Sequence, residues 1–178
     1  MPNPLANIYL KLDGIDGEST AKGHKKEIDV FSYEQGVDQT VFHSGSGGGS
    51  AVGKAKYSPV RFRKNVDVAS IPMLLACAQG KAIKDAVFTF TRGASGFEFY
   101  KVTLHSVLIT HMYQRAGTGE QYPLTFTALD AGATDNGCLD EVTLDYGQIR
   151  WEYRTQKPTG AIGTTVKGGW DVAANKKL

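Results

Sequence analysis

The chain has 178 residues, of which 41% are hydrophobic and 21% are charged, and its formal net charge at pH 7 is +2. These values are typical of a soluble globular protein, and we expect a single domain over residues 1–178 with a buried core. So small a net charge argues against duplex DNA as a partner, because DNA-binding domains usually carry a clustered basic face.

Nothing in the sequence marks a targeting or membrane segment. Met1–Ala6 forms neither a basic nor an apolar region, so we expect no signal peptide. No apolar run approaches the length of a membrane span. Cys77 and Cys138 are too few and too isolated for a disulfide framework or a metal knuckle. Synthesis in a reducing cytoplasm fits these observations best.

The N-terminal part of the chain is predicted to form two strands. Asn7–Asp13 alternates apolar and polar residues, which is typical of a half-buried strand, and it leads into a turn rich in Asp and Gly. Ile28–Gln35 has apolar groups on both faces, so we expect both faces to be covered. One of its faces carries Phe31 and Tyr33, and the other carries Val30, Ser32 and Glu34.

The segment His43–Lys56 is the most unusual in the chain. It holds five glycines in fourteen residues, and Val52 is its only apolar side chain larger than alanine. Glycine loses more backbone entropy on ordering than any other residue, and this segment has little apolar surface to offset that loss. Connections between strands are usually much shorter. We therefore expect this loop to be ordered by something outside its own domain.

A further strand follows the loop, around Val60 and Phe62, which alternate with basic residues. The basic group Arg61, Arg63 and Lys64 is interpreted as a solvated strand face. 

One helix is predicted, over Ile71–Gln79. Ser70 can cap its start, Pro72 suits its first turn, and Gly80 stands where a C-terminal cap belongs. Apolar residues with helical spacing predict its packed face: Ile71, Leu74, Leu75 and Ala78.

The rest of the chain is predicted to be β-structure. The apolar phase changes near His105 and Ser106, and again across Gly147, so we expect a bulge or bend at each place. With about eight strands, one helix and no βαβ alternation, the pattern predicts a mainly β protein. The expected architecture is a compact antiparallel β-barrel of two packed sheets, with one flanking helix and a long extended loop. The strand-like runs of this part are Ala86–Thr91, Phe97–Met112, Leu124–Thr127 and Val142–Tyr153.

One segment comes close to a phosphate-binding loop. Gly48–Ala55 fits that pattern until Ala55, which stands where a Ser or Thr would hold magnesium. Such a loop should also lead into a helix, whereas Tyr57–Val60 is extended. Nucleotide binding is therefore disfavoured.

The remaining candidates for chemistry are weak. The histidines lack metal-ligand spacing and are interpreted as surface or interface residues: His24, His43, His105 and His111. The acidic residues predicted in turns could flank a sugar, but such pairs are common by chance: Asp13, Asp16, Glu18, Asp140 and Glu141. No Gly-x-Ser-x-Gly motif lies at a strand-to-helix elbow. We expect no enzyme, no cofactor and no metal site.

Taken together, several segments in the same order resemble the haemolysin-coregulated proteins (Hcp), the tail-tube subunits of bacterial type VI secretion. The resemblance covers nearly the whole chain, and it rests on the combination rather than on one piece. The segments are Ile8–Ser19, His24 with Glu27–Val30, the glycine loop, Ala69–Ile83, Val102–Leu104, Glu141–Tyr153 and Gly168–Val172.

The resemblance implies a homohexameric ring that stacks into a hollow tube. Such a tube is expected to be assembled in the cytoplasm inside a contractile sheath, to leave the cell with a spike protein, and to carry effectors in its pore. Ser32 and Glu34 become pore-facing candidates if Phe31 and Tyr33 face the core. The loop is expected to reach an adjacent subunit or ring through His43, Gly45, Gly47, Gly48, Gly49, Val52, Gly53 and Lys54.

A different class of protein also fits the β pattern. A monomeric carbohydrate-binding β-sandwich could use carboxylates in its loops to bind a sugar, and a hydrolase with an unrecognised site is a third possibility. The oligomeric state separates these alternatives from a ring-forming protein, because only the ring requires six copies.

Overall fold

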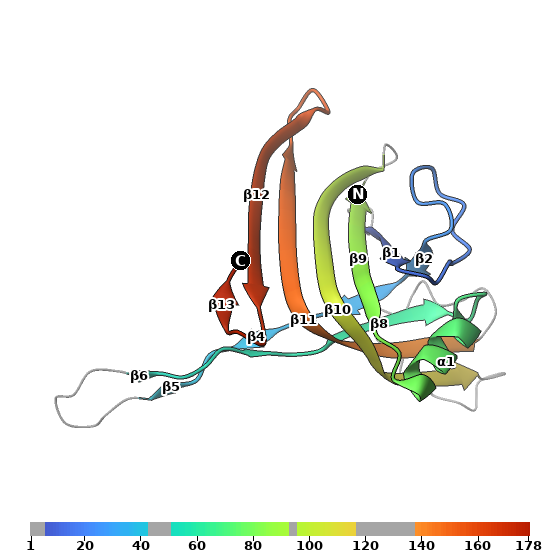
Figure 1. The fold of residues 1–178 in the computed structure, drawn as a ribbon. Coiled ribbons are helices and arrows are strands. Elements are labelled where there is room, and N and C mark those ends of the chain that lie inside the picture. Colours follow the sequence, from blue (N-terminus) through green and yellow to red (C-terminus); the bar gives the residue numbers. More distant parts are fainter. Residues whose placement is uncertain (1–5, 43–50, 93–95, 117–137) are drawn as a thin grey trace.

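A computed structural model of the chain describes residues 6–42, 51–92, 96–116 and 138–178 (Figure 1). The predicted strand at Leu124–Thr127 and the segment His43–Ser50 lie outside these residues. The one helix of the described part is α1 (Ser70–Gln79), which is too short to span a membrane. The strands are β1 (Asn7–Leu12), β2 (Ile28–Val30), β3 (Ser32–Glu34), β4 (Val37–Asp38), β5 (Val41–Phe42), β6 (Ala51–Val52), β7 (Lys56–Tyr57), β8 (Val60–Asn65), β9 (Ile83–Arg92), β10 (Phe97–Ala116), β11 (Cys138–Gln156), β12 (Ile162–Asp171) and β13 (Lys176–Lys177).

The main sheet follows the order β13-β12-β11-β10-β9-β1-β2, with every described ladder antiparallel. Strand β11 pairs with two different strands along one of its edges. Leu139–Leu144 pairs with β8, and Gln148–Gln156 pairs with β12. As a result the sheet has two parts. β8 and β3 curl under the core. β12, the part of β11 that pairs with it and the adjoining part of β10 form an upright region of the sheet, called the wall below (Figure 1). The predicted class, mainly β with one flanking helix, is confirmed.

The barrel is not closed by one continuous ladder, because β2 and β3 pair with different strands. β2 pairs with β1 and β3 pairs with β8, with Phe31 between them donating its backbone N–H to the Arg63 carbonyl. The single strand predicted over Ile28–Gln35 is therefore broken. Val30 is buried with Ile28, and Tyr33 reaches the core from the next strand, so Val30 does not share a face with Ser32 and Glu34 as predicted.

The two predicted phase changes lie opposite one another. Ser106 has a φ of 55°, in the left-handed region, and a Cβ at Gly147 would lie 3.3 Å from the Ser106 Cβ. The pairs on either side, His105 with Gln148 and Val107 with Tyr146, keep the same register. No residue is inserted there, so the irregularity is a paired kink rather than the expected bulge, and both strands change face together.

Helix α1 ends at Gln79 as predicted and begins at Ser70, one residue earlier than predicted, and the face that it packs against the core is not the predicted one. Gly80 ends it in the left-handed conformation, with φ 59°, and its N–H bonds to the Cys77 carbonyl. Its buried residues are Ser70, Met73 and Ala76. Ile71 and Leu75, which the periodicity placed in the core, are each more than half exposed. The helix is apolar on both faces, and the face of Met73 and Ala76 packs inward.

Lys64 is fully buried, contrary to its predicted place on a solvated face. Its Nζ lies 2.9 Å from Asp140 Oδ2, 2.7 Å from Asp67 Oδ1 and 3.0 Å from Ser70 Oγ. Ser70 also donates its hydroxyl to Asp140, and Gln114 donates to the other Asp140 oxygen. Ser70 is thus part of a buried polar cluster, and Ala69 holds the N-cap position instead.

The loop between β1 and β2 is tightly packed at Gly17, where a Cβ would lie 2.4 Å from the Glu27 carbonyl oxygen. We expect Gly17→Ala to lower the free energy of unfolding by about 1–3 kcal/mol, because backbone atoms must move to make room. Gly36→Ala is the control, since its nearest new contact is at 3.6 Å. Urea unfolding measures both, and equal losses in the two variants would contradict the prediction.

Candidate functional site

A two-stranded arm projects from the body of the molecule (Figure 1). β4 pairs with β7 and, further out, β5 pairs with β6. The Gly53 N–H donates to the Thr40 carbonyl, and the Gln39 side chain donates to the Gly53 carbonyl at 2.6 Å. The loop predicted over His43–Lys56 is therefore partly a hairpin, and its β-strands carry the chain away from its own core.

The arm is anchored at its base. The Tyr57 ring lies 6.2 Å from that of Trp151 and 6.1 Å from that of Trp170, between centroids. The Tyr146 hydroxyl donates to the Ser58 carbonyl at 3.0 Å. Burial raises the pKa of Tyr146 to about 12, so the hydroxyl keeps the proton that it donates at neutral pH. These contacts fix the direction in which the arm leaves the body.

The arm carries apolar side chains that are exposed to solvent in the single chain. The exposed fractions are 53% for Val37, 47% for Val41, 61% for Phe42 and 69% for Val52. Isolated exposed apolar residues are normal, but four on one narrow hairpin form a surface suited to contact with another protein. Of the predicted interface residues, Val52, Gly53 and Lys54 lie on this arm, and His43, Gly45, Gly47, Gly48 and Gly49 lie outside the described residues.

The second group of predicted site residues, Ser32 and Glu34, lies on β3. Tyr33 faces the core, with its ring 4.9 Å from Phe88 and 5.2 Å from Phe90, so its two neighbours point outward as the prediction required. They pair across to Arg63 and Arg61 on β8. These residues line a hollow of about 360 Å³.

The histidines within the described residues have separate structural contacts. His24 is buried, stacked on Tyr9 at 4.1 Å, with Nδ1 2.9 Å from Glu27 Oε2. This differs from the surface position predicted for it. His105 Nδ1 lies 2.5 Å from Asp85 Oδ1 on β9. In the described ranges, no three His, Cys, Asp or Glu residues gather as a metal site would require.

A row of charges crosses the wall, which sequence analysis missed because β12 is rich in Gly and Thr and was not predicted as a strand. Lys101, Glu152 and Lys167 are cross-strand neighbours on β10, β11 and β12. Glu152 lies 2.9 Å from Lys167 Nζ and 2.5 Å from Arg154 Nη2. The hydrogen bond from Lys167, with the charge of Arg154, lowers the pKa of Glu152.

The lowered pKa of Glu152 predicts that the stability of the folded protein depends on pH. A lowered carboxyl pKa adds stability above the unfolded-state pKa of Glu152, and that stability is lost as the pH falls through the folded-state pKa. Lys167→Gln is expected to raise the Glu152 pKa toward its usual range, whereas Lys25→Gln, an exposed change in the β1–β2 loop, is expected to leave it unchanged. NMR titration of the Glu152 carboxyl carbon measures both, and an equal pKa in wild type and Lys167→Gln would contradict the assignment.

Several known proteins similar to this chain are type VI secretion proteins. Residues 9–153 match the family described as type VI secretion system effector, Hcp. The chain is 31% identical over 172 residues to the protein hcp1 of Pseudomonas aeruginosa, covering 95% of this chain and 96% of that one. A solved type six secretion system protein has a TM-score of 0.83 and 26% identity, with 97% and 99% of the chains covered. Hcp1 from Salmonella typhimurium has a TM-score of 0.75 and 27% identity, covering 98% and 99%.

Proposed function

The chain belongs to the Hcp family of the type VI secretion system, and from this membership we propose that it is a structural tube subunit. In this proposal residues 1–178 form one tube domain, and six copies close into a ring. Rings stack into a hollow tube within the contractile sheath. The tube is assembled in the cytoplasm and exported with the spike protein, without a signal peptide, and effectors travel in its pore. No catalytic role is included.

The observation that carries the proposal is the arm, with its four exposed apolar residues held away from the body. A head-to-tail assembly needs two different surfaces on each copy, so that the patch of one copy meets another patch of the next. The outward face of α1 supplies a second apolar surface, because Ile71 and Leu75 are more than half exposed there, next to the equally exposed Val68. The arm and α1 extend at opposite sides of the molecule (Figure 1).

Ser32 and Glu34 are proposed to face the pore. Support comes from their outward position on β3, beside Arg61 and Arg63, in a polar hollow suited to contact with hydrated cargo. If they bind cargo, reversing the charge at Glu34 should change cargo retention while the assembly stays intact. Unchanged retention would count against the pore assignment.

The oligomeric state tests the ring directly. Size-exclusion chromatography with light scattering is expected to give a mass near six times 19.2 kDa or larger, and negative-stain electron microscopy is expected to show rings. A clean monomer across a wide concentration range would overturn the proposal. That result would favour the monomeric carbohydrate-binding module, which needs no partner copy.

A further inference from the structure

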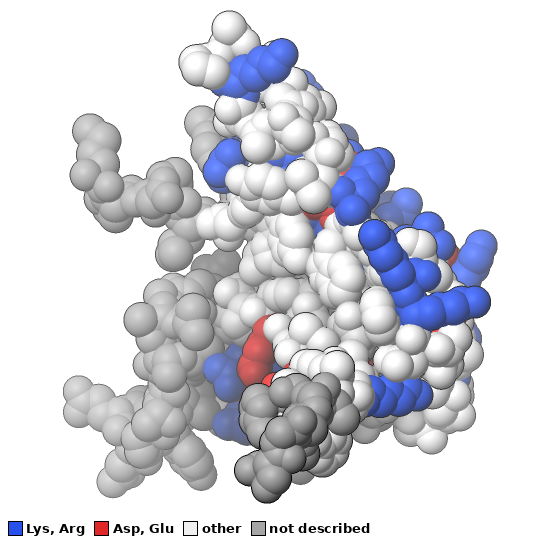
Figure 2. All heavy atoms as spheres, turned by 90° about the vertical axis from the view of Figure 1, so that its left-hand side faces the viewer, with Lys and Arg blue, Asp and Glu red and all other residues white. Residues whose placement is uncertain are grey.

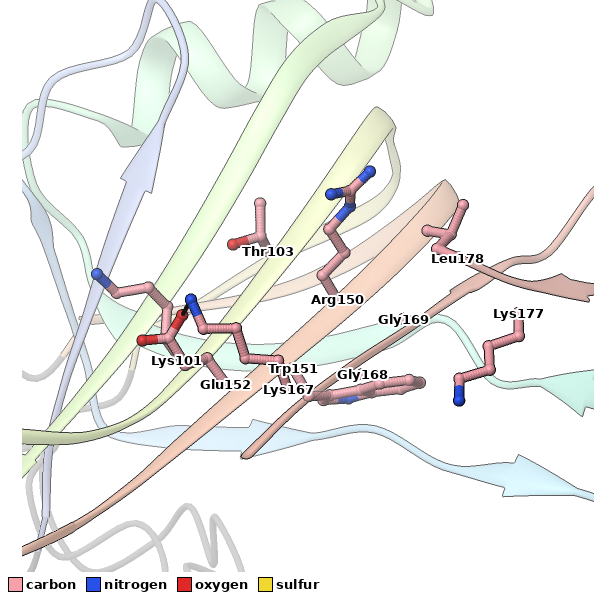
Figure 3. A pocket seen from close by; sticks show the side chains of 10 residues that line it. All are labelled: Lys101, Thr103, Arg150, Trp151, Glu152, Lys167, Gly168, Gly169, Lys177 and Leu178. Carbon is pink, nitrogen blue, oxygen red and sulfur yellow. Dashed lines mark ion pairs between the residues drawn. The ribbon is translucent and has the colours of Figure 1, made fainter. Parts of the chain in front are cut away.

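A basic hollow of about 350 Å³ opens on the wall, at the place where β10, β11, β12 and β13 meet (Figure 3). Lys101, Glu152 and Lys167 lie side by side at one end of it, and Arg150 lies further along β11. Lys177 of β13 borders the far side. Gly169 lies opposite Arg150, and a Cβ added there would lie 3.2 Å from the Arg150 Cγ and 3.2 Å from the Leu178 Cβ, so the glycine leaves room for these side chains. The hollow shares no lining residue with the hollow at Ser32, and Trp151 is common to its lining and to the base of the arm.

The positive charge in this hollow is only partly compensated. Its lining includes four basic residues and one acidic residue, Glu152, which has ion pairs with Lys167 and Arg154. Lys101 pairs with Glu98 at 3.3 Å. Arg150 and Lys177 are exposed and have no ion pair with any residue that the structure describes. In Figure 2 Lys and Arg side chains gather along the upper and right-hand side of the view, where few acidic side chains are visible. The charge complementary to this hollow is a set of carboxylates.

The hollow also borders an unpaired strand edge. β12 pairs with β11 over most of its length, but with β13 only at Trp170 and Asp171. Along Ile162–Lys167, the outer edge of β12 has no strand partner among the described residues. Unpaired backbone groups at such an edge can accept an additional strand from another chain.

We propose that this hollow and the edge of β12 together bind an extended acidic segment of a partner protein. The segment adds as a strand beside β12 and alternates carboxylate and apolar side chains. Because successive side chains of a strand point to opposite faces, its carboxylates lie on the face of Lys167, toward Lys167 and toward Arg150 on the next strand. Its apolar residues meet the other face, where Val166 is 61% exposed. This site goes beyond the proposed tube function and does not depend on it.

Calorimetric titration of the assembled protein with short synthetic peptides tests the proposal. A peptide in which glutamates alternate with valines is expected to bind, and to bind more weakly as salt is added. A peptide with the same composition but its glutamates in one block, a glutamine version, and a version with N-methylated alternate amides are all expected to bind much more weakly. The double variant Arg150→Gln with Lys167→Gln is expected to lose at least about tenfold in affinity. Lys25→Gln is the matched control for removal of an exposed charge.

The outcomes separate the possible occupants. Equal binding of the block peptide or the N-methylated peptide would overturn strand addition, and unchanged affinity in the double variant would overturn the site. Light scattering of the same samples reports the assembly. If the alternating peptide binds only while the assembly mass falls, then a neighbouring copy occupies the edge and the proposal fails. A protein that is monomeric from the start but binds the peptide would contradict the ring and leave this site standing.

Discussion

Replacing Lys64 with methionine is expected to lower the free energy of unfolding by about 3–5 kcal/mol, because the change leaves the carboxylate of Asp140 buried without its cation. Asp140 and Lys64 both have side chains with 0% exposure. Methionine has nearly the shape of the lysine stem, so little packing is lost. The thermal midpoint is expected to fall by roughly 10 °C. Urea unfolding at a fixed protein concentration measures the change in free energy.

The chain offers a matched control for this substitution. Lys26 also pairs with an aspartate, Asp16, at 3.1 Å, but both side chains are mostly exposed. Lys26→Met is therefore expected to cost only about 0–1 kcal/mol. A double variant, Lys64→Met with Asp140→Leu, removes the buried charge as well as its partner and is expected to recover most of the loss. Similar losses for the two single variants would show that burial of the charge is not what makes Lys64 important.

Replacing Phe42 and Val52 of the arm by serine is expected to abolish stacking of rings while the body of each subunit stays folded. Each arm contact would lose roughly 3–5 kcal/mol of apolar burial, which corresponds to more than about a hundredfold in affinity. The folded body should persist because neither side chain belongs to the core cluster. Electron microscopy would measure tube length, and circular dichroism would report the fold. Shortening Gly45–Gly53 is expected to have the same effect.

A control for the arm variants is Leu108→Ser, which removes an exposed apolar side chain from β10, away from the arm. It should leave tubes at wild-type length. Tubes of normal length from the Phe42 and Val52 variant would contradict a role for the arm in stacking. Loss of soluble, folded subunits would instead show that the arm supports its own core.

Sequence patterns predicted the parts of this fold that depend on local periodicity. The alternation in β1, the C-terminal end of α1 at Gly80 and the two phase changes all follow from neighbouring residues, and the structure confirms each of them. The paired kink could not be predicted as such, because the register between Ser106 and Gly147 is a property of two strands rather than of one.

Long-range partners explain the positions that sequence patterns predicted wrongly. Period-two alternation puts Lys64 on the same face as Val60 and Phe62, but a lysine there is stable only because Asp140, 76 residues later, meets it. Helix α1 is apolar on both sides, so its periodicity could not decide whether Leu75 or Met73 faces the core. The basic hollow depends on β12, whose glycines and threonines gave no clear strand pattern.

The continuity of β10 and β11 has a mechanical consequence. These strands are 20 and 19 residues long, and they run without interruption from the wall into the curled part of the sheet. Their hydrogen bonds lie across the strand direction, so a force along the strands strains many of them at once instead of opening them singly. A subunit that is pushed from one end can therefore transmit the thrust through covalent backbone to the other end without shearing its two halves apart.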